Sequence, residues 1–222
     1  AEAEALLREA LAAREVGLPE GHWLTAYTRC LLGRVLVRLG RFDEAEPLLL
    51  EVLEKHESVL GRDHPNTLGS MNNLAFLYSV QGRYAEAEPL FLETLEIEGR
   101  ALGEDHPDTL SAEHNLATEL TRVESRAEEA LPIFEDTIER RRRVLGEEHP
   151  NTLLSMSMEA VLLRRLGRYE AAERRTRETL EIRRRTLGDH HPDTIDSQMG
   201  LAIVLTKQGR FDGAETLFRQ AL

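Results

Sequence analysis

The sequence has little of several features that mark particular kinds of protein. Its single cysteine, Cys30, excludes an internal disulfide and a metal site built from several cysteines, and it suits a reducing compartment. No apolar run approaches the roughly 18 residues of a membrane-spanning helix. The opening stretch, residues 1–17, is amphipathic and acidic, unlike a signal peptide or a basic transit sequence. We therefore expect a cytoplasmic chain with no membrane partner, and a segment of something longer because no methionine starts it.

Basic charge and aromatic residues are also scarce. The 222 residues carry a formal net charge of −12, which repels a phosphate backbone, so a nucleic acid is not expected as a partner. Aromatic residues make up 5% of the chain and charged residues 31%. A composition this poor in bulky core residues and rich in Ala, Leu, Glu and Arg is typical of a long helical protein.

Catalytic signatures are missing as well. The chain has no GxGxxG, no P-loop and no GxSxG, and its many carboxylates form no isolated pair on an apolar background. Cys30 has His22 eight residues before it, but no group that would activate a thiolate, so a small side chain facing neighbouring helices is the favoured interpretation. We expect no enzyme and no cofactor.

One nonapeptide occurs four times with small changes. The copies are LGRDHPNTL, LGEDHPDTL, LGEEHPNTL and LGDHHPDTI, starting at Leu60, Leu102, Leu145 and Leu187. Histidines mark the register of the repeat, 42, 42, 43 and 42 residues apart, at His22, His64, His106, His149 and His191. A fixed period in this range indicates a solenoid of repeated structural units.

Each histidine motif has two interpretations, a metal or catalytic site and a structural joint. As a joint, its glycine ends one helix in a left-handed cap and its proline opens the next helix. As a metal site it would need three or four ligands around one point, whereas histidines one repeat apart cannot converge. The joint is therefore favoured, with no metal, and thermal unfolding should be indifferent to a chelator.

Each repeat contains two helical patterns separated by a second joint, Gly-Arg-Phe or Gly-Arg-Tyr. In the second repeat, residues 67–81 and 85–103 place apolar side chains at i, i+3, i+4 spacing on either side of Gly82. The register predicts five first helices and six second helices. The third repeat carries one inserted residue, replaces the glycine joint by residues 124–126, and has Glu119 at an apolar position, so a distorted turn is expected at residues 123–128.

The segment NNLAFLYSVQGRYAEAEPLFLETLEI, followed by LGEDHP, resembles the tetratricopeptide repeat (TPR) in the 42-residue form found in kinesin light chains. The resemblance covers essentially the whole chain. It implies an all-α fold, an α-solenoid in which antiparallel helix pairs form a right-handed superhelix. The opening segment from Gly17 also looks like repeat arrays appended to bacterial serine/threonine kinases, so the chain could belong to a kinase-linked multidomain protein.

A single TPR array is therefore predicted over residues 1–222. Residues 1–17 would be the second helix of a preceding repeat. The following repeats are 18–60, 61–102, 103–145 (irregular), 146–187 and 188–222 (truncated).

The resemblance also implies where partners bind, because first helices line the concave groove of such arrays. The residues mapped to the groove as candidate peptide contacts are Arg34, Arg38, Asn72, Asn73, Phe76, His114, Asn115, Arg122, Arg164, Arg165 and Lys207. Further residues mapped to the same face are Cys30, Leu31, Ser111, Thr118, Ser157, Met158, Val161, Asp196, Met199, Gly200 and Ile203.

Six of the mapped residues are basic and one, Asp196, is acidic, in a chain with a large acidic excess. The preferred hypothesis is a non-enzymatic interaction scaffold that holds an extended, acidic peptide, with Asn73 and Asn115 bonding its backbone. Against it stands a structural interpretation, in which the asparagines satisfy the helix and the arginines pair with nearby glutamates. A second hypothesis is a spacer or self-association module within a larger kinase or sensor protein.

Two arginine runs lie near the ends of second helices, at residues 140–143 and 183–185. Cations there suit the helix dipole and have acids one turn away. A solvated helix face is the expected role, with an anion-binding outer patch as the alternative.

Overall fold

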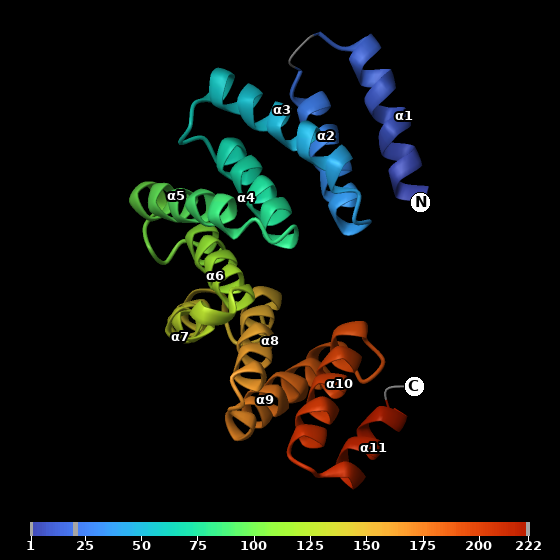
Figure 1. Ribbon diagram of the computed structural model, residues 1–222, viewed down its shortest axis with the longest axis vertical. Helices are drawn as coiled ribbons and strands as arrows, with labels where there is room; N and C mark the ends of the chain where they lie inside the picture. Colours follow the sequence, from blue (N-terminus) through green and yellow to red (C-terminus); the bar gives the residue numbers. More distant parts are fainter. Residues whose placement is uncertain (1, 20–21, 221–222) are drawn as a thin grey trace. The chain divides into compact units, whose positions relative to one another are not determined.

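A computed structural model describes residues 2–19 and 22–220 of the chain, and these residues form helices joined by short turns, with no β-strand among them. Figure 1 shows the helices in chain order. They are α1 (Glu2–Gly17), α2 (Trp23–Arg38), α3 (Phe42–Leu60), α4 (Pro65–Val80), α5 (Tyr84–Leu102), α6 (Pro107–Arg122), the 3₁₀ helix η1 (Glu124–Arg126), α7 (Ala127–Leu145), α8 (Pro150–Arg165), α9 (Tyr169–Leu187), α10 (Pro192–Lys207) and α11 (Phe211–Gln220).

The helices form two compact units, Ala1–Ala101 and Leu102–Leu222. In the first unit α1 packs on α2, α2 on α3 and α3 on α4; in the second, consecutive helices pack from α6 to α11. Each neighbour runs antiparallel to the one before, as expected for an α-solenoid. The described residues contain the five first helices and six second helices that the register predicts, while residues 221–222 of the last predicted repeat lie outside them.

The histidine motif is a helix–turn–helix joint, as predicted. His64 is the N-cap of α4, and its Nδ1 accepts a hydrogen bond from the Asn66 backbone N–H at 3.1 Å. His22, His106, His149 and His191 cap their helices through the same bond. A neutral imidazole nitrogen thus satisfies one of the backbone donors that every helix N-terminus leaves without a partner.

Glycine ends the helix on the other side of each joint. Gly61 has φ of +87° and ψ of 165°, a backbone region that essentially only glycine adopts. Thr67 closes the turn, since its hydroxyl donates to the Gly61 carbonyl at 2.7 Å. Positive φ angles recur at the eight glycines where turns are predicted: Gly40, Gly61, Gly82, Gly103, Gly146, Gly167, Gly188 and Gly209.

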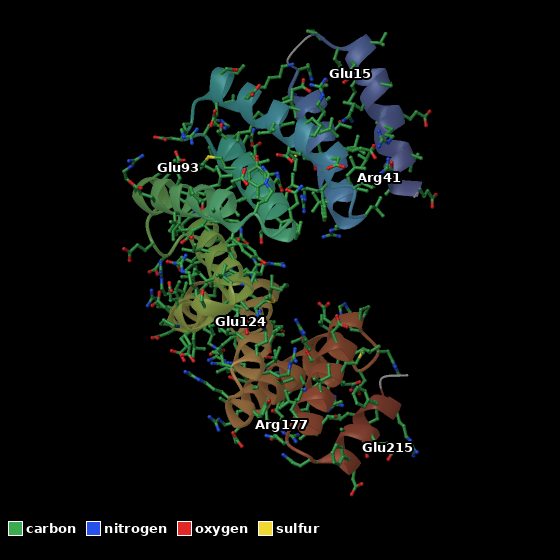
Figure 2. All side chains as sticks on the ribbon, in the orientation of Figure 1. Glu15, Arg41, Glu93, Glu124, Arg177 and Glu215 are labelled. Carbon is green, nitrogen blue, oxygen red and sulfur yellow. The ribbon has the colours of Figure 1, made fainter. Side chains whose placement is uncertain are left out.

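The third repeat departs from this pattern where the sequence predicts it. The helix α6 ends at Arg122, and its C-cap residue Val123 has an extended backbone. The 3₁₀ helix η1, whose first residue Glu124 is labelled in Figure 2, replaces the glycine turn. One repeat later Glu159 occupies an apolar position and is 2% exposed. Its carboxylate forms an ion pair with Arg175 of α9, and burial raises the pKa of Glu159.

Candidate functional site

The first helices of neighbouring repeats contact one another within each unit. In the first unit α2 contacts α4, and in the second α8 contacts both α6 and α10. Equivalent positions on successive first helices therefore form rows across the helices. The candidate residues occupy five such rows, and each unit presents its own set.

One row is almost entirely basic. The residues at this position are Arg38 on α2, Arg122 on α6, Arg165 on α8 and Lys207 on α10, with Val80 on α4 as the exception. All four basic side chains are exposed. Within the second unit, Arg122, Arg165 and Lys207 stand at the ends of three adjacent helices.

These cations form no ion pairs. In the described part of the chain, Arg34, Arg38, Arg122, Arg164 and Lys207 have neither a carboxylate partner nor a hydrogen bond to another side chain. Arg165 donates to the backbone carbonyl of Thr121 and to no acid. Positive charge at these positions is therefore not compensated by the described residues, whereas Arg29 of α2 pairs with Glu15 and Glu51.

Arginines of the second helices and the joints behave differently. Arg83 binds Glu46 at 2.8 Å, Arg143 binds Asp105 at 2.7 Å, and Arg177, labelled in Figure 2, binds Glu173 at 2.8 Å. The exceptions on second helices, with no ion pair among the described residues, are Arg14, Arg141, Arg174 and Arg183. The structural interpretation, in which groove arginines pair with nearby glutamates, does not describe the cations mapped to the groove.

The polar and aromatic candidates of the first unit lie together on α2 and α4. Asn73 donates from Nδ2 to Cys30 Sγ at 3.1 Å, while its Oδ1 has no partner among the described residues. Asn72 is half-buried and its Oδ1 also lacks a partner there. Phe76, one turn from both, is 44% exposed. Burial raises the pKa of the Cys30 thiol, so this cysteine is a neutral packing partner rather than a nucleophile.

His114 lies inside the helix packing of the second unit. It is 8% exposed, its Nδ1 contacts Ser155 Oγ at 3.0 Å, and its ring meets Phe134 edge-on. Burial and the nearby Arg141 lower the pKa of His114 to about 4. A side chain held this way cannot reach a ligand on the surface, so we leave it out of the candidate site. Its neighbour Asn115 is half-buried and keeps its mapped position on α6.

A cleft of about 280 Å³ opens between α8 and α10, and we call it the α8–α10 cleft. It combines apolar walls, hydroxyl groups and charged groups of both signs. Its lining is Leu154, Ser157, Ala160, Val161 and Arg164 of α8, Thr176, Thr179 and Arg183 of α9, and Asp193, Asp196, Ser197, Gly200 and Val204 of α10. Five mapped groove residues, from Ser157 to Gly200, thus line a real depression.

Two arginines from the runs at residues 140–143 and 183–185 are buried, so the expectation of a solvated face is wrong for them. Arg141 is 2% exposed and Arg183 is 8% exposed. Their guanidinium groups bond to serine hydroxyls and backbone carbonyls of the following helix, and burial lowers the pKa of Arg141 to about 10. In the sequence, the burial of these arginines could have been inferred from the matching serines Ser155 and Ser197. Each stands fourteen residues after its arginine.

The match to known families decides the identity of the fold. A tetratricopeptide repeat model matches residues 24–97, 67–125, 119–184 and 160–222. The chain belongs to the TPR family. TPR domains are protein–protein interaction modules that bind proteins or peptides, and they are typically non-catalytic. No curated protein matches the chain.

Solved TPR structures superpose on the chain along most of its length. TPR-like repeats described as those of a Podosopora anserina kinesin light chain have 27% identity and a TM-score of 0.72, covering 88% of this chain and 92% of that one. BtubC from P. vanneervenii has 22% identity, a TM-score of 0.79 and coverage of 97% and 89%. A Rap protein complexed with competence and sporulation factor has 18% identity, a TM-score of 0.77 and coverage of 96% and 57%.

The described residues hold no group of three or more His, Cys, Asp or Glu side chains arranged to bind a metal ion. None of the helices in residues 2–19 and 22–220 is long and apolar enough to cross a membrane.

Proposed function

We propose that this TPR array binds an extended, acidic peptide of a partner protein along its first helices, and that it does so without catalysis. The observation that carries the proposal is the set of first-helix cations without ion pairs, Arg34, Arg38, Arg122, Arg164 and Lys207. Most other arginines of this acidic protein have a carboxylate partner. Cations without carboxylate partners on the first helices of each unit favour a partner that supplies the missing carboxylates.

Charge-assisted hydrogen bonds to carboxylates are about twice as strong as neutral ones, so they give the acidic side chains of the peptide their affinity. The amide groups of Asn73 and Asn115 supply donors and acceptors for a peptide backbone. Phe76 adds exposed apolar area on α4. The Rap protein, which shares the fold at low identity, is described in complex with a peptide factor, so the fold accommodates peptides.

The test is a titration of the 222-residue chain with labelled peptides of about ten residues, long enough to span about 33 Å when extended. Three sets are compared: acidic, basic and neutral, at about 50 and about 300 mM salt. We expect the acidic set to bind best and to weaken with salt, and Asn73→Ala to weaken binding further. Equal affinity for acidic and basic sets at low salt would contradict the proposal.

The alternative is a spacer or self-association module, in which the outer faces make the contacts. It predicts a mass in solution that rises with protein concentration and no preference among the peptide sets. Sedimentation of the same protein at increasing concentrations separates the two functions.

A further inference from the structure

Arg183, in the α8–α10 cleft, has an incompletely used guanidinium group. Its Nη1 donates to the Asp193 carbonyl at 3.0 Å and to Ser197 Oγ at 2.7 Å. Its Nε is buried without a hydrogen-bond partner, and its Nη2 donates to no described residue. The side chain is 8% exposed and forms part of the cleft lining. A largely buried arginine with an unused donor therefore lines an open cleft.

Arg141 is the equivalent arginine one repeat earlier, and its Nη2 has hydrogen-bond acceptors that Nη2 of Arg183 lacks. Arg141 makes the same two Nη1 bonds, to the Asn151 carbonyl at 2.6 Å and to Ser155 Oγ at 2.7 Å. Its Nη2 also donates to the Leu110 carbonyl at 3.0 Å and contacts Ser111 Oγ at 3.3 Å.

The repeat register places Leu154 where the earlier repeat has Ser111. Leu154 offers no hydroxyl, and it lines the cleft with 45% of its surface exposed. The change from Ser111 to Leu154 removes the side-chain acceptor that Nη2 has in the earlier repeat. At Arg141 the protein supplies acceptors for Nη2, whereas at Arg183 none of the described residues does.

The chemistry of the cleft selects the ligand. Nη2 of Arg183 has no acceptor among the described residues, and a guanidinium prefers a carboxylate, whose oxygens match its donors. Arg164, which has no ion pair among the described residues, adds a second positive charge. Asp193 and Asp196 line the same cleft and balance these two cations in formal charge. One negative charge is therefore better tolerated than the two of a phosphate group.

We propose that the α8–α10 cleft seats the carboxylate of one glutamate or aspartate side chain of the bound peptide, with Nη2 of Arg183 as donor and Arg164 as the second cation. The apolar side chains of Leu154, Val161 and Val204 contact the methylene stem of that residue. The inference rests on the proposed function, because it assumes that a peptide carries the carboxylate.

A single amino-acid probe tests the cleft without knowledge of the partner. The isotope-labelled chain is titrated with N-acetylglutamate N-methylamide, and backbone amide signals are followed by NMR. The glutamine analogue is the neutral control, and the phosphoserine analogue tests for a phosphate site. We expect the glutamate probe alone to shift the signals of Ser197 and Gly200 strongly. Equal shifts from the glutamine probe, or larger ones from phosphoserine, would overturn the proposal.

Leu154→Ser is the decisive variant, because it restores the hydroxyl that Ser111 provides to Arg141. We expect it to fold as the wild type does and to bind the glutamate probe about fivefold or more weakly, since Nη2 gains an internal partner. Arg183→Gln should lose about tenfold. The control is Arg185→Gln, which removes an exposed cation that pairs with Glu148, and it should bind as the wild type does. Unchanged binding in Leu154→Ser overturns the proposal, even if Arg183→Gln fails to fold.

The two proposals fail separately. If acidic peptides bind with salt dependence but neither cleft variant changes their affinity, the cleft proposal is wrong and the peptide function stands. If the glutamate probe binds and no peptide does, the carboxylate site stands and the peptide function is wrong.

Discussion

Arg141 and Ser155 are joined by a hydrogen bond of 2.7 Å from Nη1 to Oγ, across the joint between α7 and α8. The same link recurs between Arg183 and Ser197 at 2.7 Å. In the first unit His56 Nδ1 contacts Ser70 Oγ at 2.8 Å in the equivalent place. The end of a second helix is thus tied to the following first helix by one polar side chain, in addition to the apolar packing.

This link gives a stability prediction for Arg141→Met. Replacing the buried guanidinium leaves the Leu110 and Asn151 carbonyls without their donor, and we expect a loss of about 2–4 kcal/mol in unfolding free energy. Urea unfolding followed by circular dichroism measures it. The control, Arg143→Met, removes an exposed arginine whose side chain is 60% accessible and should change stability by about 0.5 kcal/mol or less. Equal effects in the two variants would show that the buried link contributes nothing.

Two glycines of the first unit should respond in opposite directions to alanine. Gly82 has φ of +77° at the turn after α4, so Gly82→Ala should cost about 1–2 kcal/mol. Gly69 is within α4, and a Cβ there would meet nothing within 4 Å, so Gly69→Ala should stabilise by about 0.5–1 kcal/mol. Thermal unfolding of the pair measures both. A stabilising Gly82→Ala would contradict the assigned turn.

Burial of His114 predicts a pH dependence of stability. Its folded pKa is about 4, below the value of about 6.5 in an unfolded chain, so the unfolded state binds the extra proton first. Its contribution to stability is therefore present above about pH 6.5 and is lost as the pH falls toward 4, by up to about 3 kcal/mol.

The matched control for this titration is His114→Asn, since Asn72 occupies the same position one repeat earlier. Unfolding midpoints of the two proteins are compared between pH 7 and pH 4.5. We expect the wild type to lose more stability than the variant over that range. Parallel losses would show that His114 titrates with an ordinary pKa.

The fold was predictable because its signals are local and repeated. Gly61 and Pro65 show where one helix ends and the next begins, and the apolar spacing around Leu74 shows which face is buried. The irregular turn at Val123 followed from a missing glycine. Because the repeats are similar, each of these sequence patterns occurs several times in the one chain.

The site was less predictable, because side-chain partners are not local. The burial of Arg141 depends on helices 31 residues before it and 14 residues after it. The same geometry encloses His114, which the repeat register placed in the groove. Whether Arg38 pairs with an acid depends on which carboxylates lie within reach of it in the folded chain, and the sequence alone does not give those distances. The serine positions and the loss of a hydroxyl at Leu154 became informative once the buried arginines were known.

The most direct test of the account compares neutralised cations on the first helices with neutralised cations elsewhere at equal net charge. One variant carries Arg38→Gln and Arg122→Gln; the other carries Arg143→Gln and Arg185→Gln, both exposed and already ion-paired. Affinity for the acidic peptide set is measured at low salt. The account predicts a loss of about tenfold or more in the first variant and about twofold or less in the second. Equal losses in both would mean that overall charge, and not the first helices, attracts the peptide.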